Sequence, residues 1–292
     1  MKKVALKVAY IGTNFHGFQR QPNHRTVEGE LIYALKKAGL VEDLKKSYFS
    51  IAGRTDRGVH ALGNVISFMS EKEVIINQIN DHLPEDIQIL AKAPVHYGFK
   101  PRYALKRHYK YIISEKASRY PLLWELDIPS ENGFDLEKMI EAASYFEGTH
   151  NFINFSKRSE RNPLRSVDEV KVSKNGEIIV IDVVGESFLW NMVRKMVKTI
   201  LEAGNGKIKP SDIIEMLNPE NNIPLKPMVP ENLILMDVDY KNLNFTYDDY
   251  ACYRFQSTLK DELFKHKSAT LLEESLINDL DALKQKINLE IK

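Results

Sequence analysis

The chain is poor in cysteine, since Cys252 is the only one among its 292 residues. A single cysteine excludes an internal disulfide and any metal site built from several thiolates. The eight histidines fall singly, without the H-E-x-x-H spacing of a zinc site. A dinucleotide-binding fingerprint and a phosphate-binding P-loop are also missing. These absences disfavour redox, nucleotide-hydrolysing and metal-dependent chemistry, so we expect no metal and no small-molecule cofactor.

Long hydrophobic runs are missing too. No apolar stretch approaches the roughly 20 residues of a membrane span. The opening MKKVALKVAY alternates polar and apolar residues, unlike the apolar core of a signal peptide. We therefore expect a cytoplasmic protein without membrane contact. The net charge is only +1, so binding to nucleic acid has to depend on local clusters of charge.

The spacing of apolar residues along the sequence predicts the order β-α-β-β-α-β twice. In the first copy strands fall near residues 3–10, 48–52, 63–68 and 87–93, with one helix between Thr26 and Gly39 and another near 74–82. In the second copy strands fall near 107–115, 167–173, 178–185 and 233–240, with helices after Asp135, near 189–203, and inserted near 211–217. The fold class is α+β, with two ferredoxin-like halves and a cleft between them. We expect domains at 1–103 and 104–250 and a helical tail at 251–292.

The segment AGRTDRGVHALGNVISF, residues 52–68, places Asp56 between Arg54 and Arg57 on a short loop between two strands. Neighbouring guanidinium groups favour an ionised carboxylate. Such a carboxylate in a basic, anion-attracting site suits a nucleophile or a base. The alternative is a turn held by an Asp–Arg ion pair, which is the commoner explanation of a bare R-x-D.

Basic and aromatic residues gather in four other segments. Residues 9–31 interleave aromatic rings with cations, a composition suited to RNA, although the phenylalanines could equally cover the sheet. Residues 99–114 form the densest basic run, in which alternation places Tyr109 and Tyr111 on one face. Residues 156–165 are rich in arginine, which suits phosphates. In residues 187–197 Arg194 lies early in an apolar helix and needs a partner if buried, for which Asp56 is the candidate.

The string GRTDRGVHA at 53–61 resembles the signature of the TruA-type tRNA pseudouridine synthases. The segments at 9–31, 99–114 and 187–197 are similar to further motifs of that family, in the same order. Near 229–233 the family usually has a Gly before a Leu that packs on the target base, whereas this chain has Asn232 before Leu233. Asn tolerates left-handed backbone, so we keep Leu233 as a pocket residue.

The resemblance implies that the protein isomerises uridine to pseudouridine in the anticodon stem-loop of tRNA, at positions 38, 39 and 40. It further implies a homodimer that binds tRNA. Catalysis would use Asp56 as nucleophile, Arg54 and Arg194 to hold its carboxylate, and Tyr109 to stack on the base. The expected substrate-binding residues are Phe18, Arg20, Arg57, His60, Lys106, Arg107, Lys110, Arg158, Arg161 and Leu233.

Three alternatives remain open from the residues themselves. The same chemistry could serve another RNA site. A catalytically silent RNA-binding protein could share the fold, although a carboxylate in a phosphate-binding groove costs affinity. A uracil-directed glycosidase would hydrolyse the same bond and release uracil. The tail carries a stripe of Leu276, Leu280, Leu283 and Ile287, which predicts a helix that docks on the second domain or on a dimer partner more readily than an RNA-binding arm.

Overall fold

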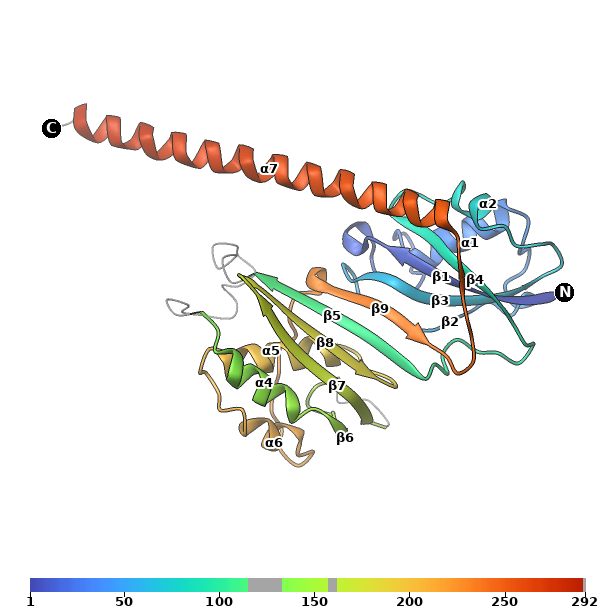
Figure 1. Cartoon of the computed structure of the whole chain (residues 1–292), viewed down its shortest axis with the longest axis horizontal. Helices are drawn as coiled ribbons and strands as arrows, with labels where there is room; N and C mark the ends of the chain where they lie inside the picture. The colour runs from blue at the N-terminus through green and yellow to red at the C-terminus, as the bar shows by residue number, and fades with distance from the viewer. Residues whose placement is uncertain (115–132, 157–161, 291–292) are drawn as a thin grey trace.

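The computed structural model describes residues 1–114, 133–156 and 162–290, which form an α+β fold around one large, mostly antiparallel sheet (Figure 1). The strands lie in the order β10-β4-β1-β3-β9-β5-β8-β7-β6, and β2 pairs with β3 beside this path. Two large hydrophobic cores flank the middle of the sheet, one built mainly from the first 104 residues together with Leu235, Val238 and Ala251, and one built mainly from the chain that follows together with Val59.

The N-terminal half of the sheet comes from the first copy of the predicted pattern. Its elements are β1 (Lys2–Tyr10), α1 (Val27–Lys37), β2 (Ser50–Ile51), β3 (His60–Ser70), α2 (Ile76–Asn80) and β4 (Ile87–Val95). Helix α1 begins where expected, because the Thr26 side chain accepts a hydrogen bond from the Gly29 N–H. Strand β1 lies between β3 and β4 and is antiparallel to both, so nearly all its residues are buried.

The C-terminal half follows the second copy with additions. Its elements are β5 (Lys106–Ser114), α4 (Leu136–Ser144), β6 (Gly148–Asn151), β7 (Leu164–Asn175), β8 (Ile178–Gly185), α5 (Met192–Gly204), α6 (Asp212–Leu217) and β9 (Leu233–Asp239). The predicted Asp135 cap is confirmed, since its carboxylate accepts from the Lys138 N–H. Ile140, expected to face inward from α4, is instead 49% exposed because it lies on the solvent side of that helix. The short strand β6 was not predicted.

The two halves meet where β3 pairs in parallel with β9 over His60–Ile234 and Ala61–Leu235. Gly63 makes this approach possible, because a Cβ there would lie 2.7 Å from the Met236 carbonyl oxygen. Strand β5 pairs with β9 on the other side, so the sheet runs from one half into the other without a break. The loop that carries Asp56 lies directly before β3 and is therefore held at this junction.

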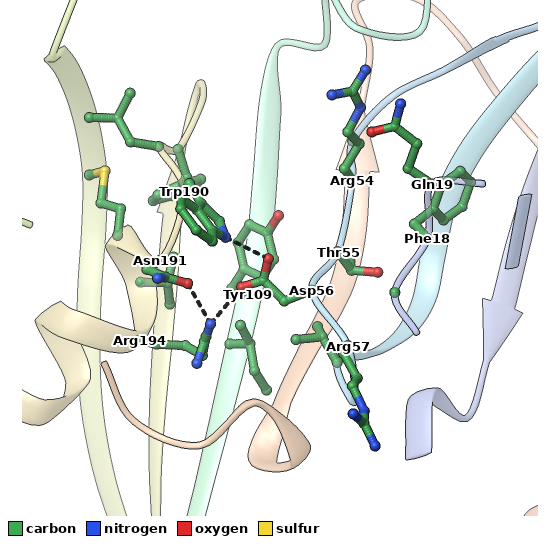
Figure 2. A pocket seen from close by; sticks show the side chains of 18 of the residues that line it. Phe18, Gln19, Arg54, Thr55, Asp56, Arg57, Tyr109, Trp190, Asn191 and Arg194 are labelled. Carbon is green, nitrogen blue, oxygen red and sulfur yellow. Dashed lines mark hydrogen bonds and ion pairs between the residues drawn. The ribbon is translucent and has the colours of Figure 1, made fainter. Parts of the chain in front are cut away.

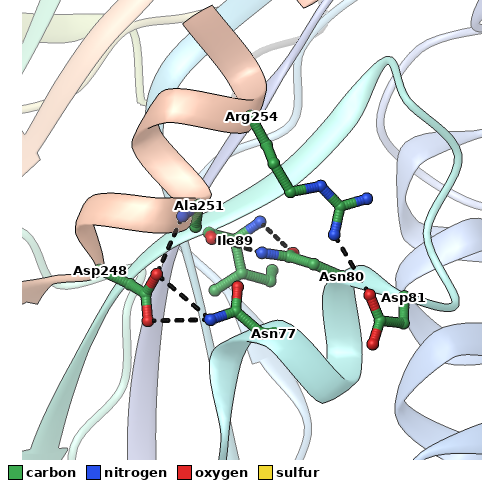
Figure 3. A network of polar contacts seen from close by, with 7 residues as sticks. All are labelled: Asn77, Asn80, Asp81, Ile89, Asp248, Ala251 and Arg254. Carbon is green, nitrogen blue, oxygen red and sulfur yellow. Dashed lines mark hydrogen bonds and ion pairs between the residues drawn. The ribbon is translucent and has the colours of Figure 1, made fainter. Parts of the chain in front are cut away.

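Helix α7 (Asp249–Glu290) leaves the body of the molecule as one long projecting helix (Figure 1). It follows a short edge strand, β10 (Thr246–Tyr247), that pairs with β4. Its first turns are anchored on α2: Asn77 donates to the Asp248 carboxylate at 3.2 Å, and Arg254 pairs with Asp81 at 3.2 Å (Figure 3). The helix begins earlier than the tail was expected to, and its described apolar side chains beyond Phe255 do not pack on the second domain.

No helix within the described ranges is both long enough and apolar enough to cross a membrane. The same part of the chain holds no group of three or more His, Cys, Asp or Glu side chains placed to bind a metal ion.

Candidate active site

An open pocket of about 820 Å³ lies at the junction of the two halves, and Asp56 is part of its lining (Figure 2). The lining comes from four stretches of chain: residues 16–21 after the short 3-10 helix η1 (Gly12–Asn14), the loop 51–59, Tyr109 on β5, and residues 188–194 at the start of α5. Leu233, the first residue of β9, also lines it. The segments that carry the sequence motifs therefore converge on one cavity.

Asp56 is held on both carboxylate oxygens. Arg194 donates from Nη2 to Oδ2 at 2.6 Å, and the Trp190 indole donates from Nε1 to Oδ1 at 2.9 Å. The Arg194 side chain is only 11% exposed, so its charge needs this partner. The predicted ion pair between Asp56 and Arg194 is thus confirmed. The Trp190 contact was not predicted, although Trp190 lies within the motif that pointed to Arg194.

Arg194 is itself fixed by its surroundings. It donates to the Met228 carbonyl oxygen at 2.7 Å and to the side-chain oxygen of Asn191. Asn191 precedes the first residue of α5 and has a φ of 64°, a left-handed conformation that Asn adopts more readily than most residues. Because of this left-handed residue, the helix predicted near 189–203 begins only at Met192. Trp190 therefore lies before the helix, and its indole faces Asp56.

The loop that carries Asp56 is braced by the N-terminal half. The Thr55 hydroxyl shares a hydrogen bond of 2.8 Å with the Tyr10 hydroxyl, which also accepts from Asn64 at 3.2 Å. Burial raises the pKa of Tyr10, so its phenol stays protonated. The Phe18 N–H donates to the Thr55 carbonyl oxygen at 3.0 Å. These contacts hold the loop 51–59 from behind and leave the Asp56 side chain facing the pocket.

Tyr109 lies on the pocket side of β5, with its ring edge-on to Phe188 at 5.3 Å between ring centres. Burial raises the pKa of Tyr109 to about 12, with the Arg107 charge acting in the opposite direction. The hydroxyl is therefore protonated at neutral pH and can donate a hydrogen bond. Its neighbour on the same face, Tyr111, is fully buried as expected and donates to the Val229 carbonyl oxygen at 2.9 Å.

Two predicted arginines make no ion pair with the Asp56 carboxylate within the described residues. Arg54 lines the pocket but points away from Asp56 (Figure 2). In this structure Arg194, and not Arg54, contacts the carboxylate. Arg107 is buried and donates to the backbone carbonyls of Ala52, Arg102 and Glu186. Because all three contacts are to backbone carbonyls of the protein itself, Arg107 ties the start of the loop 51–59 to β5.

Some of the other predicted binding residues line the pocket, and others lie outside it. Arg57 is exposed, while Phe18 and Leu233 are buried, and all three line the cavity. Arg20 lies outside the lining, 3.7 Å from Glu28. Lys106 and Lys110 also lie outside it and pair with Asp168 at 3.2 Å and Asp182 at 3.5 Å. Arg158 and Arg161 fall outside the described residues.

His60 connects the halves below the pocket. Its Nδ1 accepts from the Gly12 N–H at 3.1 Å, which leaves Nε2 to donate to the Glu231 carbonyl oxygen at 2.9 Å. Both ring nitrogens are thus used by backbone groups, and burial lowers the pKa of His60. Nearby, Asn232 does not adopt the left-handed backbone that its replacement of a Gly suggested, and its side chain donates to the Ile112 carbonyl oxygen at 2.9 Å.

Comparison with known proteins agrees with this arrangement. A family model described as tRNA pseudouridine synthase matches residues 6–104 and 142–241, which include the pocket-lining stretches 16–21, 51–59 and 188–194, while Tyr109 lies between the two matched ranges. The chain belongs to the tRNA pseudouridine synthase family. This membership confirms the expected enzyme class, an RNA pseudouridine synthase that acts as an isomerase.

Individual relatives match almost from end to end. The chain is 49% identical to a tRNA pseudouridine synthase A of Methanobrevibacter smithii, over 99% of this chain and 100% of the relative. It is 48% identical to the protein of the same name from Methanothermobacter thermautotrophicus, over 98% of each chain. The Pyrococcus furiosus protein of that name is 38% identical over 94% of this chain and 97% of its own. The likeness therefore extends beyond the motifs to the whole chain.

Proposed function

We propose that this synthase converts uridine to pseudouridine in the anticodon stem-loop of tRNA, at positions 38, 39 and 40, with Asp56 as the reacting group. The observation that carries the proposal is the Asp56–Arg194 ion pair of 2.6 Å at an open pocket between the halves. This ion pair fixes one oxygen of the carboxylate, and Asp56 still lines the pocket. The names of the relatives support tRNA as the substrate.

The reaction moves one base on one sugar. In one route an Asp56 oxygen forms a bond to C1′ while the C1′–N1 bond breaks and uracil leaves with the electron pair. The base then turns, C5 bonds to C1′ as Asp56 departs, and C5 loses its proton while N1 regains one. In the other route Asp56 takes the proton from C2′ while the C1′–N1 bond breaks, which gives a glycal and a uracil anion. C5 of the turned base then bonds to C1′ as C2′ regains its proton, and C5 loses its proton while N1 gains one. Neither route changes the oxidation state of the whole nucleotide or consumes water.

Tyr109 is placed to stabilise the base during this turn. Its ring lies on the pocket side of β5 close to Phe188, so the two rings present aromatic surface to an unstacked uracil. Because its phenol is protonated at neutral pH, it can donate to a uracil oxygen or return a proton, but does not act as a ready base. Buried Leu233 adds an apolar wall.

Exposed cations near the pocket suit the phosphates around a flipped nucleotide. Arg54 and Arg57 both line the cavity from the exposed catalytic loop, and the described structure gives neither an ion pair. We infer that they contact the RNA backbone, so that Arg54 serves the substrate and Arg194 serves Asp56. We expect further contacts to RNA phosphates outside the pocket, from Arg20, Lys106, Lys110, Arg158 and Arg161.

We further infer that the two halves are ferredoxin-like units that correspond to domains 1–103 and 104–250. The strand orders β4-β1-β3-β2 and β9-β5-β8-β7, each with two helices, support this interpretation. A homodimer is the expected assembly. The outer part of α7 supports it, because Leu272, Leu276, Leu280 and Leu283 are exposed apolar side chains on this helix.

The direct test is to incubate the protein with unmodified tRNA transcripts and to map pseudouridine by carbodiimide-stop sequencing. The proposal expects new stops at positions 38, 39 and 40 with wild-type protein and none with Asp56→Asn. Stops at other positions would reassign the substrate site. Release of free uracil would identify a glycosidase, and tRNA binding without any product would identify a silent binder.

A further inference from the structure

The mechanism above leaves one contact in the site unused, the hydrogen bond between Trp190 and Asp56. The indole Nε1–H lies 2.9 Å from Asp56 Oδ1, the oxygen that Arg194 does not hold (Figure 2). In the free protein a donor therefore occupies each oxygen of the group that is expected to react. The indole and the incoming nucleotide compete for the same side of the carboxylate, since Trp190 lines the same pocket.

The chemistry requires one of these donors to withdraw. A hydrogen bond to a carboxylate is strongest while the carboxylate is fully charged. When an Asp56 oxygen forms a bond to C1′, or takes a proton, that charge falls. A donor that remains on the reacting oxygen stabilises the starting state more than the transition state, which slows the step. The reacting oxygen is therefore the one whose donor leaves more easily.

The surroundings of the two donors differ. Arg194 is 11% exposed, lies in helix α5, and is tied to Met228 and Asn191 as well as to Asp56. Trp190 is 53% exposed and lies just outside the helix, before the left-handed turn at Asn191. Its bond to Asp56 is from a neutral donor, whereas that of Arg194 is from a cation. Trp190 can thus be displaced at lower cost than Arg194.

We propose that Trp190 is a positioning residue that holds Asp56 Oδ1 in the free protein and releases it when the target nucleotide enters, which makes Oδ1 the reacting oxygen. This inference rests on the proposed function of Asp56. Arg194 keeps Oδ2 throughout, and the indole is replaced at Oδ1 by the sugar of the nucleotide.

Single-turnover rates at saturating tRNA test the release. Trp190→Phe keeps an aromatic ring but removes the N–H, and Trp124→Phe makes the same exchange at the only other tryptophan. We expect Trp190→Phe to react at least as fast as wild type, and up to about tenfold faster, the scale of one hydrogen bond to a charged group. Trp124→Phe should leave the rate unchanged. A rate for Trp190→Phe that falls about tenfold with unchanged tRNA affinity would show that the N–H acts in the transition state, and would overturn the proposal.

Fluorescence provides a readout that does not depend on activity. In Trp124→Phe protein all tryptophan emission comes from Trp190, so stopped-flow mixing with tRNA follows this side chain directly. We expect a change in emission before pseudouridine appears. The change should shrink when Asp56→Ala is added, because the free protein then lacks the bond that is broken. Equal changes with and without Asp56, or none in either protein, would contradict the release.

The two proposals fail in distinguishable ways. If Asp56→Ala still forms pseudouridine, the assignment of the reacting group is wrong. If Asp56→Ala is inactive, but the change in Trp190 emission on mixing with tRNA is the same with and without Asp56, only the role proposed for Trp190 is wrong. Thermal unfolding of Trp190→Phe should match wild type, since the side chain is half exposed, and a large loss of stability would indicate a structural role instead.

Discussion

At the residue scale the site depends on which arginine pairs with the carboxylate. Two candidates were adjacent in sequence and one was 138 residues away. The distant one, Arg194, makes the ion pair because it is nearly buried and has no water to stabilise its charge. Arg54 is exposed, so its charge is stabilised by solvent and the side chain stays available to the RNA. Burial decided the partner more strongly than nearness along the chain.

Tyr109 gives a prediction at this scale. Tyr109→Phe keeps the ring and removes the hydroxyl, while Tyr109→Leu also removes the stacking surface. We expect Phe to bind tRNA normally but to react much more slowly, because the protonated hydroxyl is a donor near the turning base. Leu should lose in addition roughly 1–3 kcal/mol of base stabilisation. Filter binding and single-turnover rates for both variants check this, and wild-type rates in both would show that Tyr109 only packs the core.

At the element scale the sequence predicted local order well and long-range geometry poorly. Thr26 and Asp135 were recognisable as helix caps, because a cap depends on a hydrogen bond within three residues. The left-handed Asn191 was not recognised, since Asn is common in ordinary helix-flanking positions as well. Because of that residue α5 begins at Met192, three residues later in the chain than expected, and Trp190 lies before the helix, next to Asp56.

The Asp56–Arg194 pair was predicted across elements, but two other side-chain contacts across elements were not. Arg107 and His60 were expected to bind substrate, because basic residues in a motif suggest RNA. In the structure Arg107 donates to three backbone carbonyls, while His60 accepts from the Gly12 N–H and donates to the Glu231 carbonyl oxygen. Their partners are main-chain groups, which carry no residue-specific signal that a sequence pattern could reveal.

His60 gives a prediction at the scale of the elements that it connects. Burial lowers the pKa of His60 below the ordinary value near 6.5. At pH values between the lowered and the ordinary pKa, the unfolded chain therefore binds a proton at His60 and the folded protein does not. The stability that depends on neutral His60 is therefore complete above about pH 6.5 and falls as the pH drops toward the lowered folded value. We expect the melting temperature of wild type to fall more steeply with acid than that of His60→Asn. If the melting temperatures of the two proteins fall equally with decreasing pH, neutral His60 does not contribute to stability in this way.

At the scale of the whole molecule, the projecting helix α7 has many exposed apolar side chains that contacts within one chain do not explain. A helix of 42 residues is not held by the few contacts of its first turns, and most of its apolar side chains face solvent. Exposed apolar stripes of this kind usually mark a surface for another protein. The described residues do not show the tail packed on the second domain, and docking on a dimer partner stays a prediction.

The assembly can be tested directly by light scattering after size exclusion. We expect wild type to behave as a dimer and the double variant Leu276→Asp with Leu280→Asp to behave as a monomer, because charges replace apolar contacts on one face of α7. Leu271→Asp is a matched control, since Leu271 is also exposed but lies on a different face. A monomeric wild type, or an equal response to both changes, would argue against the tail as the dimer contact.

The central claim is that Asp56 performs the chemistry and the surrounding cations bind the RNA. The most direct measurement compares single-turnover pseudouridine formation and tRNA affinity for wild type and Asp56→Asn, which keeps the shape of the side chain and removes its charge. The account predicts no detectable product from Asp56→Asn with tRNA affinity close to wild type, because affinity comes mainly from contacts to phosphate. A variant that retains even about a tenth of the wild-type rate, a barrier change of only about 1.4 kcal/mol, would contradict it.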